Sequence, residues 1–301
     1  MKVLICDATA PQALETIATA GIEVTDKPDV TLEELMEMLP AYDGMVVRSR
    51  TKVRQPLIDV AANLKVIVRG GVGLDNIDVA YAQSKGIKVL NTPAASTDSV
   101  AELTVGYLFA LARRIPQMTA SMKAGKWEKK AFEGTELAGK TLGLIGAGRI
   151  GRGVARRAAA LGMTVIGSRR AVAQSAEGIE ILPLDDVFAR SDYISLHIPH
   201  TEETHNIVNA ETIAKMKAGA RIINCGRGGT IDEDALYDAI VSGKIAGAAL
   251  DVYAEEPSKG HKLYTLDEVI GSPHIGASTK EAQIRIGAEV TQKVIGALAN
   301  R

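Results

Sequence analysis

The chain has 301 residues, of which 46% are hydrophobic and 24% are charged, and its formal net charge is −1. This length accommodates two domains of ordinary size, and the composition is typical of a globular protein. A charge this close to zero provides no long-range attraction to nucleic acid or to an anionic membrane, and no apolar run reaches the roughly 18 residues of a membrane span. We therefore expect a small-molecule ligand, with neither nucleic acid nor membrane as a partner.

The two cysteines, Cys6 and Cys225, lie in separate apolar runs, and the chain contains no C-x-x-C pair. Two buried thiols fit this placement better than a disulfide, so we expect a reducing, cytoplasmic setting. A strand pattern begins almost at the first residue, and we expect no signal peptide. The histidines lack metal-ligand spacing, and we expect no metal site.

The first third of the chain alternates short apolar runs with helical patterns, which predicts a parallel sheet covered by helices on both faces. The motif Thr31-x-x-Glu34 has the form of a capping box and predicts a helix through Leu35 and Leu39. The expected strands span residues 3–6, 22–24, 45–48, 66–69 and 87–90.

A polar stretch with a proline, residues 91–99, follows and is expected to connect two domains. Ser99-x-x-Glu102 can cap a long helix that continues to Ile115. The segment after this helix runs to Trp127 with no obvious core of its own. Helix and arm are compatible either with a contact between subunits or with a helix buried inside its domain.

A second series of alternating strand and helix patterns occupies residues 141–275. Two of its apolar runs, residues 221–225 and 248–251, are hydrophobic on both faces, as central strands of a parallel sheet are. A last amphipathic helix is expected over residues 278–300, with Ile284, Ile286, Val290, Val294 and Leu298 on its apolar face. The strands of this series are expected at residues 142–145, 164–167, 193–197, 221–225 and 246–252, and its helices near residues 184–189, 211–216 and 233–241.

The motif Gly146-x-Gly148-x-x-Gly151 stands between an apolar run that ends at Ile145 and a helical pattern. Gly146 allows a tight turn, Gly148 lets a pyrophosphate approach the backbone, and Gly151 lets helix and strand pack closely. The start of the helix adds unpaired N–H groups and the positive end of its dipole. The motif alone is weak evidence, but its place between strand and helix predicts a dinucleotide-binding site rather than a structural turn.

The second strand of such a domain indicates which dinucleotide is bound. An acidic residue about 20 positions after the glycines holds the ribose 2′-hydroxyl of NAD. Here the strand ends in Ser168, Arg169 and Arg170, with no carboxylate. A hydroxyl and two guanidinium groups suit a 2′-phosphate, so NADP(H) is favoured. NAD(H) stays possible if both arginines are ordinary surface residues.

Three polar residues stand at or just beyond strand ends of the second series, where ligands of open α/β sheets bind. Arg227 lies in a glycine-rich loop, Glu256 follows Asp251 in a loop, and His274 lies between a proline and a glycine. Each alone could be an ordinary surface or structural residue. Together they supply what reduction of a 2-keto acid requires, namely a cation for the carboxylate, a proton donor, and a carboxylate that orients this donor.

These motifs, in this order, resemble those of the D-isomer-specific 2-hydroxyacid dehydrogenases over essentially the whole chain, and among them most closely the 3-phosphoglycerate dehydrogenases. The resemblance rests on residues 47–53, 71–78, 122–127, 146–151, 224–229, 251–257 and 272–282. It implies two α/β domains with parallel sheets, Rossmann-like or flavodoxin-like. Residues 1–94 and 278–301 would form a discontinuous substrate-binding domain, and residues 95–277 the dinucleotide-binding domain inserted into it.

The resemblance and the glycine motif together assign site residues by position. The catalytic set would be Arg227, Glu256 and His274. The residues expected to bind the cofactor are Gly146, Gly148, Arg149, Ile150, Gly151, Ser168, Arg169, Arg170, His197, Ile198, Pro199, Cys225, Gly226, Asp251, Gly276 and Ala277, with Asp251 on the nicotinamide carboxamide. The residues expected to bind the substrate are Arg48, Ser49, Arg69, Val72 and Gly73. The helix from Ser99 and the arm to Trp127 would build a homodimer.

The substrate that the resemblance implies is D-3-phosphoglycerate or its keto form, 3-phosphohydroxypyruvate, as in serine biosynthesis. The lack of an acidic residue at Arg169 is a trait of glyoxylate and hydroxypyruvate reductases, so an NADPH-dependent reductase of hydroxypyruvate or glyoxylate is the alternative. A dinucleotide-sensing protein similar to corepressors of the family is a third and less favoured function. Because the sequence ends at Arg301, we expect no C-terminal regulatory domain and no feedback by serine.

Overall fold

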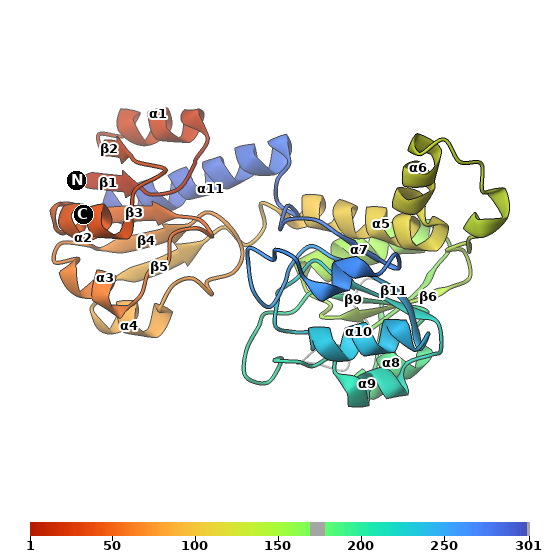
Figure 1. Ribbon diagram of the computed structural model, residues 1–301. Helices are drawn as coiled ribbons and strands as arrows, with labels where there is room; N and C mark the ends of the chain where they lie inside the picture. The colour runs from red at the N-terminus through yellow and green to blue at the C-terminus, as the bar shows by residue number, and fades with distance from the viewer. Residues whose placement is uncertain (169–177, 300–301) are drawn as a thin grey trace. The chain divides into compact units, whose positions relative to one another are not determined.

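The structure is a computed structural model that describes residues 1–168 and 178–299 (Figure 1). Contacts divide the chain into two compact units, Met1–Ser96 with Ala277–Arg301, and Thr97–Gly276. The first boundary falls two residues after the expected one at residue 94, and the second falls one residue before the expected one at residue 278.

The first unit contains a five-stranded parallel sheet in the order β2-β1-β3-β4-β5. Alternate residues of its central strands point to opposite faces. Val3, Ile5 and Val46 pack in one core with α1 (Pro11–Thr19) and α11 (Lys280–Leu298). Figure 1 shows these two helices next to each other beside the sheet. Leu4 and Met45 pack in another core with α2 (Leu32–Met38), α3 (Gln55–Val60) and α4 (Val79–Ser84). The strands are β1 (Lys2–Ile5), β2 (Glu23–Asp26), β3 (Gly44–Val47), β4 (Val66–Arg69) and β5 (Lys88–Asn91), and a 3₁₀ turn, Leu39–Ala41, follows α2.

The predicted capping box at the start of α2 is confirmed. Thr31 Oγ1 accepts a hydrogen bond from Glu34 N at 3.2 Å, and Glu34 Oε2 accepts one from Thr31 N at 2.9 Å. Two N–H groups at the start of the helix are therefore satisfied locally.

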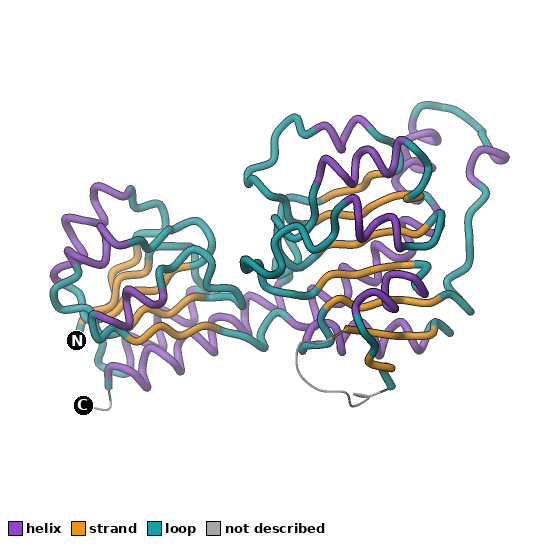
Figure 2. Tube along the Cα trace, turned by 90° about the horizontal axis from the view of Figure 1, so that it is seen from below, coloured by secondary structure: helices purple, strands orange, loops and turns teal. Residues whose placement is uncertain are grey.

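The second unit contains a seven-stranded parallel sheet in the order β12-β11-β10-β9-β6-β7-β8. One face carries α5 (Thr97–Arg113) and α7 (Arg149–Ala160), and the other carries α8 (Leu184–Arg190), α9 (Ala210–Lys215) and α10 (Glu233–Val241), as Figures 1 and 2 show. The strand order reverses between β6 and β9, and ligands of such sheets bind at this switch point. The strands are β6 (Thr141–Ile145), β7 (Thr164–Ser168), β8 (Glu180–Ile181), β9 (Tyr193–Leu196), β10 (Ala220–Asn224), β11 (Ile245–Leu250) and β12 (Val269–Gly271). The prediction of two parallel α/β sheets is confirmed.

The helix that was expected to start at Ser99 is different in the structure. α5 begins at Thr97, so Ser99 lies inside the first turn and is buried, and it does not cap the helix. α5 also ends before Ile115, because Arg114 has a left-handed conformation with φ of 52°. A separate helix, α6 (Ile115–Lys123), starts there with Pro116 in its first turn, where the missing N–H of proline costs no hydrogen bond. A 3₁₀ turn, Lys129–Phe132, follows in the arm.

The prediction was also wrong for one residue of the apolar face of α11. Ile284 is 67% exposed, whereas Ile286, Val290, Val294 and Leu298 are buried against the first sheet. The sequence positions of the four buried residues keep the spacing of one helical stripe, and Ile284 lies outside it.

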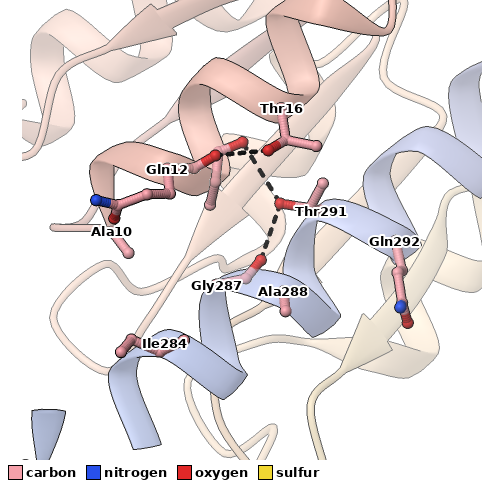
Figure 3. A pocket seen from close by; sticks show the side chains of 9 residues that line it. Ala10, Gln12, Thr16, Ile284, Gly287, Ala288, Thr291 and Gln292 are labelled. Carbon is pink, nitrogen blue, oxygen red and sulfur yellow. Dashed lines mark hydrogen bonds between the residues drawn. The ribbon is translucent and has the colours of Figure 1, made fainter. Parts of the chain in front are cut away.

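Ile284 instead borders an open groove of about 570 Å³ beside α1 and α11 (Figure 3). Small residues meet here, and a Cβ at Gly287 would lie 3.3 Å from the Cβ of Ala10. The two helices can therefore approach closely. Thr291 Oγ1 donates to Gly287 O at 2.9 Å, within α11. The remaining lining residues are Gln12, Ala13, Thr16, Ala288 and Gln292.

Both cysteines are free and buried, as predicted, and burial raises the pKa of the Cys225 thiol to about 12. Among the helices of the described residues, none is long and apolar enough to cross a membrane.

Candidate active site

The strands of the second sheet end in one row. Ser168, Ile145, Leu196, Asn224, Leu250 and Gly271 are successive partners in the strand register. The predicted site residues of this unit stand at or after these six positions. Motifs that are far apart in the sequence therefore lie along one edge of the sheet, where the carboxyl ends of the parallel strands meet.

The glycine turn after β6 has the geometry that its three glycines predict. Gly146 has a φ of 101°, and a Cβ there would lie 2.6 Å from His197 O. A Cβ at Gly151 would lie 2.3 Å from Gly146 O, so α7 packs against the turn only because this residue lacks a side chain. A Cβ at Gly148 would meet no atom within 4 Å, and no side chain caps the start of α7. The open space and the uncapped N–H groups suit a phosphate.

His197 adds a second feature that suits a dinucleotide. Its Nε2 pairs with Ser195 Oγ at 2.9 Å, whereas its Nδ1 is shielded from solvent and has no hydrogen-bond partner among the described residues. Burial lowers the pKa of His197 to about 4, so the ring is neutral at neutral pH. A buried polar atom without a partner is costly, and a bound cofactor next to the turn could supply the missing hydrogen bond.

The other predicted cofactor residues are distributed along the same edge. Arg149 and Ile150 begin α7, Ser168 ends β7, and Ile198 and Pro199 follow β9. Cys225 and Gly226 follow β10, Gly276 ends the second unit, and Ala277 begins the second segment of the first unit. Arg169 and Arg170, on which the choice of dinucleotide depends, lie outside the described residues.

Asp251, directly after β11, is 1% exposed and organises the loop that contains His274. Its Oδ1 accepts hydrogen bonds from the Ser272 hydroxyl and from Ile275 N, the latter at 2.8 Å. Its Oδ2 accepts one from Gly276 N at 2.8 Å. A carboxylate has about four acceptor sites, so the predicted contact with a carboxamide would be an addition to this structural role.

Arg227 lies in a loop that two buried polar side chains, those of Asn224 and Thr230, hold in place. Asn224, which is 2% exposed, donates from Nδ2 to Arg227 O at 3.0 Å and to Thr230 Oγ1 at 3.1 Å, and Thr230 Oγ1 donates to Arg227 O at 2.7 Å. A Cβ at Gly228 would lie 1.7 Å from Tyr253 O. Only glycine therefore lets this loop rest on the loop that follows β11.

His274 and Glu256 form a pair between two loops. His274 Nδ1 lies 2.8 Å from Glu256 Oε2, and Glu256 Oε1 accepts a hydrogen bond from Tyr253 N at 3.2 Å. The side chains are 40% and 37% exposed, so the pair can be reached from solvent. His274 has a φ of 54°, a left-handed conformation that is uncommon outside glycine and recurs at functional sites.

The pKa of Glu256 connects all three predicted catalytic residues. Burial raises it, but the hydrogen bond and charge of His274, the Tyr253 N–H and the charge of Arg227 lower it further, so it lies below its ordinary value. Glu256 is therefore ionised at neutral pH, and an ionised carboxylate favours the imidazolium form of a neighbouring histidine.

The predicted substrate residues lie together at the carboxyl edge of the first sheet. Val47 and Arg69 are partners in register, and Arg48 follows Val47. Arg48 donates from Nη1 to Ala8 O at 3.3 Å and to Gln283 Oε1 at 2.7 Å, and burial lowers the pKa of its guanidinium. Both of these acceptors are neutral oxygens, whereas the charge of the nearby Asp7 carboxylate raises the pKa of Arg48 and partly offsets the effect of burial.

The loop that contains the predicted substrate residues Val72 and Gly73 is contacted by one of these arginines. A Cβ at Gly71 would lie 1.9 Å from Arg69 Nη1, so the guanidinium lies against the backbone of Gly71. Asn91 Nδ2 donates to Val72 O and fixes the loop, and Gly73 follows directly. Ser49 is exposed and lies two residues after the end of β3.

Sequence reasoning missed the residues that support the site from beneath: Asn224, Thr230, Ser272, and Glu233, whose Oε1 accepts from Ala254 N at 2.8 Å. Asn224 and Ser272 are the first residues of two motifs that predict the site, residues 224–229 and 272–282, and this position was the available signal. Glu233 starts a helix and gave none. No group of three metal-ligating side chains occurs in residues 1–168 and 178–299.

Fold and site together define the class of protein. A sheet with the strand order and glycine turn of a dinucleotide-binding domain carries a His–Glu pair and an arginine at its edge. This combination is that of an oxidoreductase that uses a nicotinamide cofactor.

Comparison with known proteins identifies the family. Residues 105–276, more than half of the chain, match the model of the D-isomer specific 2-hydroxyacid dehydrogenase NAD binding domain. The chain is 54% identical over 276 residues to a hydroxypyruvate reductase of Thermotoga maritima, covering 91% of this chain and 90% of that protein. It is 50% identical over 299 residues to a D-3-phosphoglycerate dehydrogenase of Methanocaldococcus jannaschii, covering 98% of this chain but only 57% of that protein.

A solved structure of a related reductase has the same fold as this chain. The NADPH-dependent glyoxylate/hydroxypyruvate reductase of Sinorhizobium meliloti, in complex with NADP and malonate, superposes with a TM-score of 0.86 at 30% identity, over 99% of this chain and 94% of that one. The chain belongs to the D-isomer specific 2-hydroxyacid dehydrogenase family, as its motifs predicted.

Two alanine substitutions separate the structural role of the glycine turn from its role in ligand binding. Gly151→Ala should lower both thermal stability and dinucleotide affinity, because its Cβ would lie 2.3 Å from Gly146 O. Gly148→Ala should leave stability unchanged, because its Cβ meets nothing within 4 Å, yet weaken dinucleotide binding by about tenfold or more by filling the space for phosphate. Thermal unfolding and titration of NADPH fluorescence measure the two effects.

Gly296→Ala in α11 is the matched control, since its Cβ also meets nothing within 4 Å. It should raise stability slightly, by about 0.5–1 kcal/mol, and leave binding unchanged. Wild-type dinucleotide affinity in Gly148→Ala would rule out the turn as the phosphate site.

Proposed function

We propose that the chain transfers a hydride between a nicotinamide dinucleotide and a D-2-hydroxy acid or its keto form, with D-3-phosphoglycerate and 3-phosphohydroxypyruvate as the substrate pair. The observation that carries this proposal is the 2.8 Å contact between His274 and Glu256, at a sheet edge where the loop of Arg227 packs on the loop of Glu256. Both named relatives act on substrates of this class, which supports the assignment.

The three catalytic side chains divide the tasks of the reduction among them. His274 gives a proton to the oxygen of the keto group, and Glu256 keeps the imidazole protonated and oriented through Nδ1. Arg227 holds the substrate carboxylate as a planar fork and stabilises charge on the reacting oxygen. The bound nicotinamide supplies the hydride in reduction and accepts it in oxidation. In the oxidation, His274 takes the proton of the hydroxyl.

We propose NADP(H) as the preferred dinucleotide. Support comes from the sequence, which has Ser168, Arg169 and Arg170, and no carboxylate, at the positions where NAD-binding domains have the acidic residue that binds the ribose. The Sinorhizobium meliloti relative, which uses NADPH, is consistent with this choice. Residues Gly146, Gly148 and Gly151 would hold the pyrophosphate at the start of α7.

The arginines of the first unit support a phosphorylated substrate. A Cβ at Gly71 would meet Arg69 Nη1, and a Cβ at Gly70 would lie 3.5 Å from Arg48 Cγ, so two guanidinium side chains adjoin the loop that contains Val72 and Gly73. A second candidate function is reduction of hydroxypyruvate or glyoxylate, which the 54% identity to a hydroxypyruvate reductase favours.

A substrate panel tests the proposal. Initial rates with 3-phosphohydroxypyruvate, hydroxypyruvate and glyoxylate are compared with NADPH and with NADH. We expect kcat/KM to be highest for the phosphorylated acid, by about 10–100-fold, which is the value of one or two charge-assisted hydrogen bonds to the phosphate. We also expect a ratio above one for NADPH over NADH.

The panel also separates the alternatives. A preference for hydroxypyruvate would establish the second candidate, and a ratio below one would establish NAD(H). Dinucleotide binding without turnover of any acid would contradict an enzyme and indicate a sensor.

We further propose a homodimer that uses α5, α6 and the arm to Trp127. None of the nine described residues of α6 is buried, and Phe109, Ile115, Met122 and Trp127 are 40%, 43%, 55% and 81% exposed. Exposed apolar side chains in one region mark an interaction surface. Figure 1 shows α6 standing out from the other helices of its unit.

Sedimentation velocity tests the dimer. The wild type should sediment with twice the mass of one chain, 31.8 kDa, and Trp127→Ala should shift the equilibrium towards the single chain. Tyr264→Ala, an exposed aromatic residue outside this surface, should have no effect. A monomeric wild type at micromolar concentration would contradict the proposal.

A further inference from the structure

The loop of residues 272–276 is held by hydrogen bonds on both sides of His274. Ser272 donates from its hydroxyl to Asp251 Oδ1, and Ile275 N and Gly276 N donate to the same carboxylate at 2.8 Å each. Ser272 O accepts from Tyr253 Oη at 2.9 Å. The position of the His274 side chain thus depends on donors that surround one buried carboxylate.

Ser272 has a further partner on another element. Tyr107 of α5, 165 positions earlier in the chain, donates from its hydroxyl to Ser272 Oγ at 2.5 Å. Burial raises the pKa of Tyr107 to about 12, so the phenol keeps its proton and remains a donor. A serine hydroxyl has only one hydrogen. Because Tyr107 acts as the donor in its bond with Ser272 Oγ, the serine hydrogen stays available for the Asp251 carboxylate, which is an acceptor.

We propose that Tyr107 is a positioning residue for catalysis, which through the Ser272 hydroxyl and the Asp251 carboxylate fixes the loop that carries His274. Tyr107 is 8% exposed and acts through other side chains. The left-handed backbone of His274, with a φ of 54°, is not a conformation that the loop would keep unaided. The inference rests on the proposed role of His274 in proton transfer.

Tyr107→Phe tests the inference, because it keeps the ring and removes the donor. The first measurement is amide hydrogen exchange of Ile275 and Gly276, whose N–H groups are bound to Asp251. We expect both amides to exchange at least about tenfold faster, and kcat for keto-acid reduction to fall by about three- to tenfold, the effect of one lost hydrogen bond. Affinity for ADP, which can occupy the glycine turn but has no nicotinamide to reach the loop of Asp251, should stay within about twofold of the wild-type value, because the glycine turn is untouched.

Tyr42→Phe is the matched control. Tyr42 is 9% exposed and donates from its hydroxyl to Thr25 Oγ1 at 3.0 Å, in the first unit. The same chemical change at similar burial should alter neither the exchange of residues 275 and 276 nor kcat. If Tyr42→Phe caused the same losses, the effect of Tyr107→Phe would be general and the inference would be wrong.

Ser272→Ala and the double variant test whether the residues act in one chain. The double variant should be no worse than Ser272→Ala alone, because Tyr107 would act only through Ser272. Losses that multiply, or unchanged amide exchange in Tyr107→Phe, would overturn the inference. If Tyr107→Phe failed to fold, Ser272→Ala would measure the same connection without disturbing α5. If the wild type reduced none of the acids, the proposed function would fail, while amide exchange would still decide whether Tyr107 holds the loop.

Discussion

The buried carboxylate of Asp251 is the constraint on which the geometry of the proposed catalytic site depends. A charged group that is 1% exposed is stable only with its hydrogen-bonding capacity used, and the loop after β12 supplies these donors. The same three bonds bend the loop around His274 into a left-handed conformation. The hydrogen bonds that satisfy the Asp251 carboxylate therefore also orient the imidazole of His274.

The parallel register of the second sheet brings the remaining groups to this point. Asn224, Leu250 and Gly271 are neighbours across three strands, so the loops that carry Arg227, Glu256 and His274 begin side by side. Glycine then permits contacts that no other residue would allow. Gly228 lets the Arg227 loop touch Tyr253 O, and Gly146 lets the turn after β6 touch His197 O.

Much of this arrangement could be predicted from the sequence, because its signals are local. The capping box at Thr31 was correct, since both of its bonds join residues three positions apart. The similar pattern at Ser99 was wrong, because the helix starts two residues earlier and a local motif cannot show where the preceding chain becomes helical. Ile284 was assigned to the apolar face by residue type, although its position lies off the stripe that faces the sheet.

The supporting network of the site could not be predicted in this way. Tyr107 and Ser272 are 165 positions apart, and neither has a neighbouring residue that indicates the other. The motif around Asp251 predicted a ligand contact, but its bonds to Ile275 N and Gly276 N involve backbone groups, which every residue has and no residue type indicates. Active-site side chains leave a signal in residue type and spacing. The groups that hold them in place are specified by the fold.

The pairing of Glu256 with His274 is tested most directly by the pH dependence of kcat for keto-acid reduction in Glu256→Gln. In the proposed mechanism, reduction requires a protonated His274, and the ionised Glu256, whose pKa lies below its ordinary value, stabilises that proton. Loss of the carboxylate charge should move the alkaline limb of the profile to lower pH and lower kcat at neutral pH. An alkaline limb at the wild-type position, with kcat unchanged, would contradict the account.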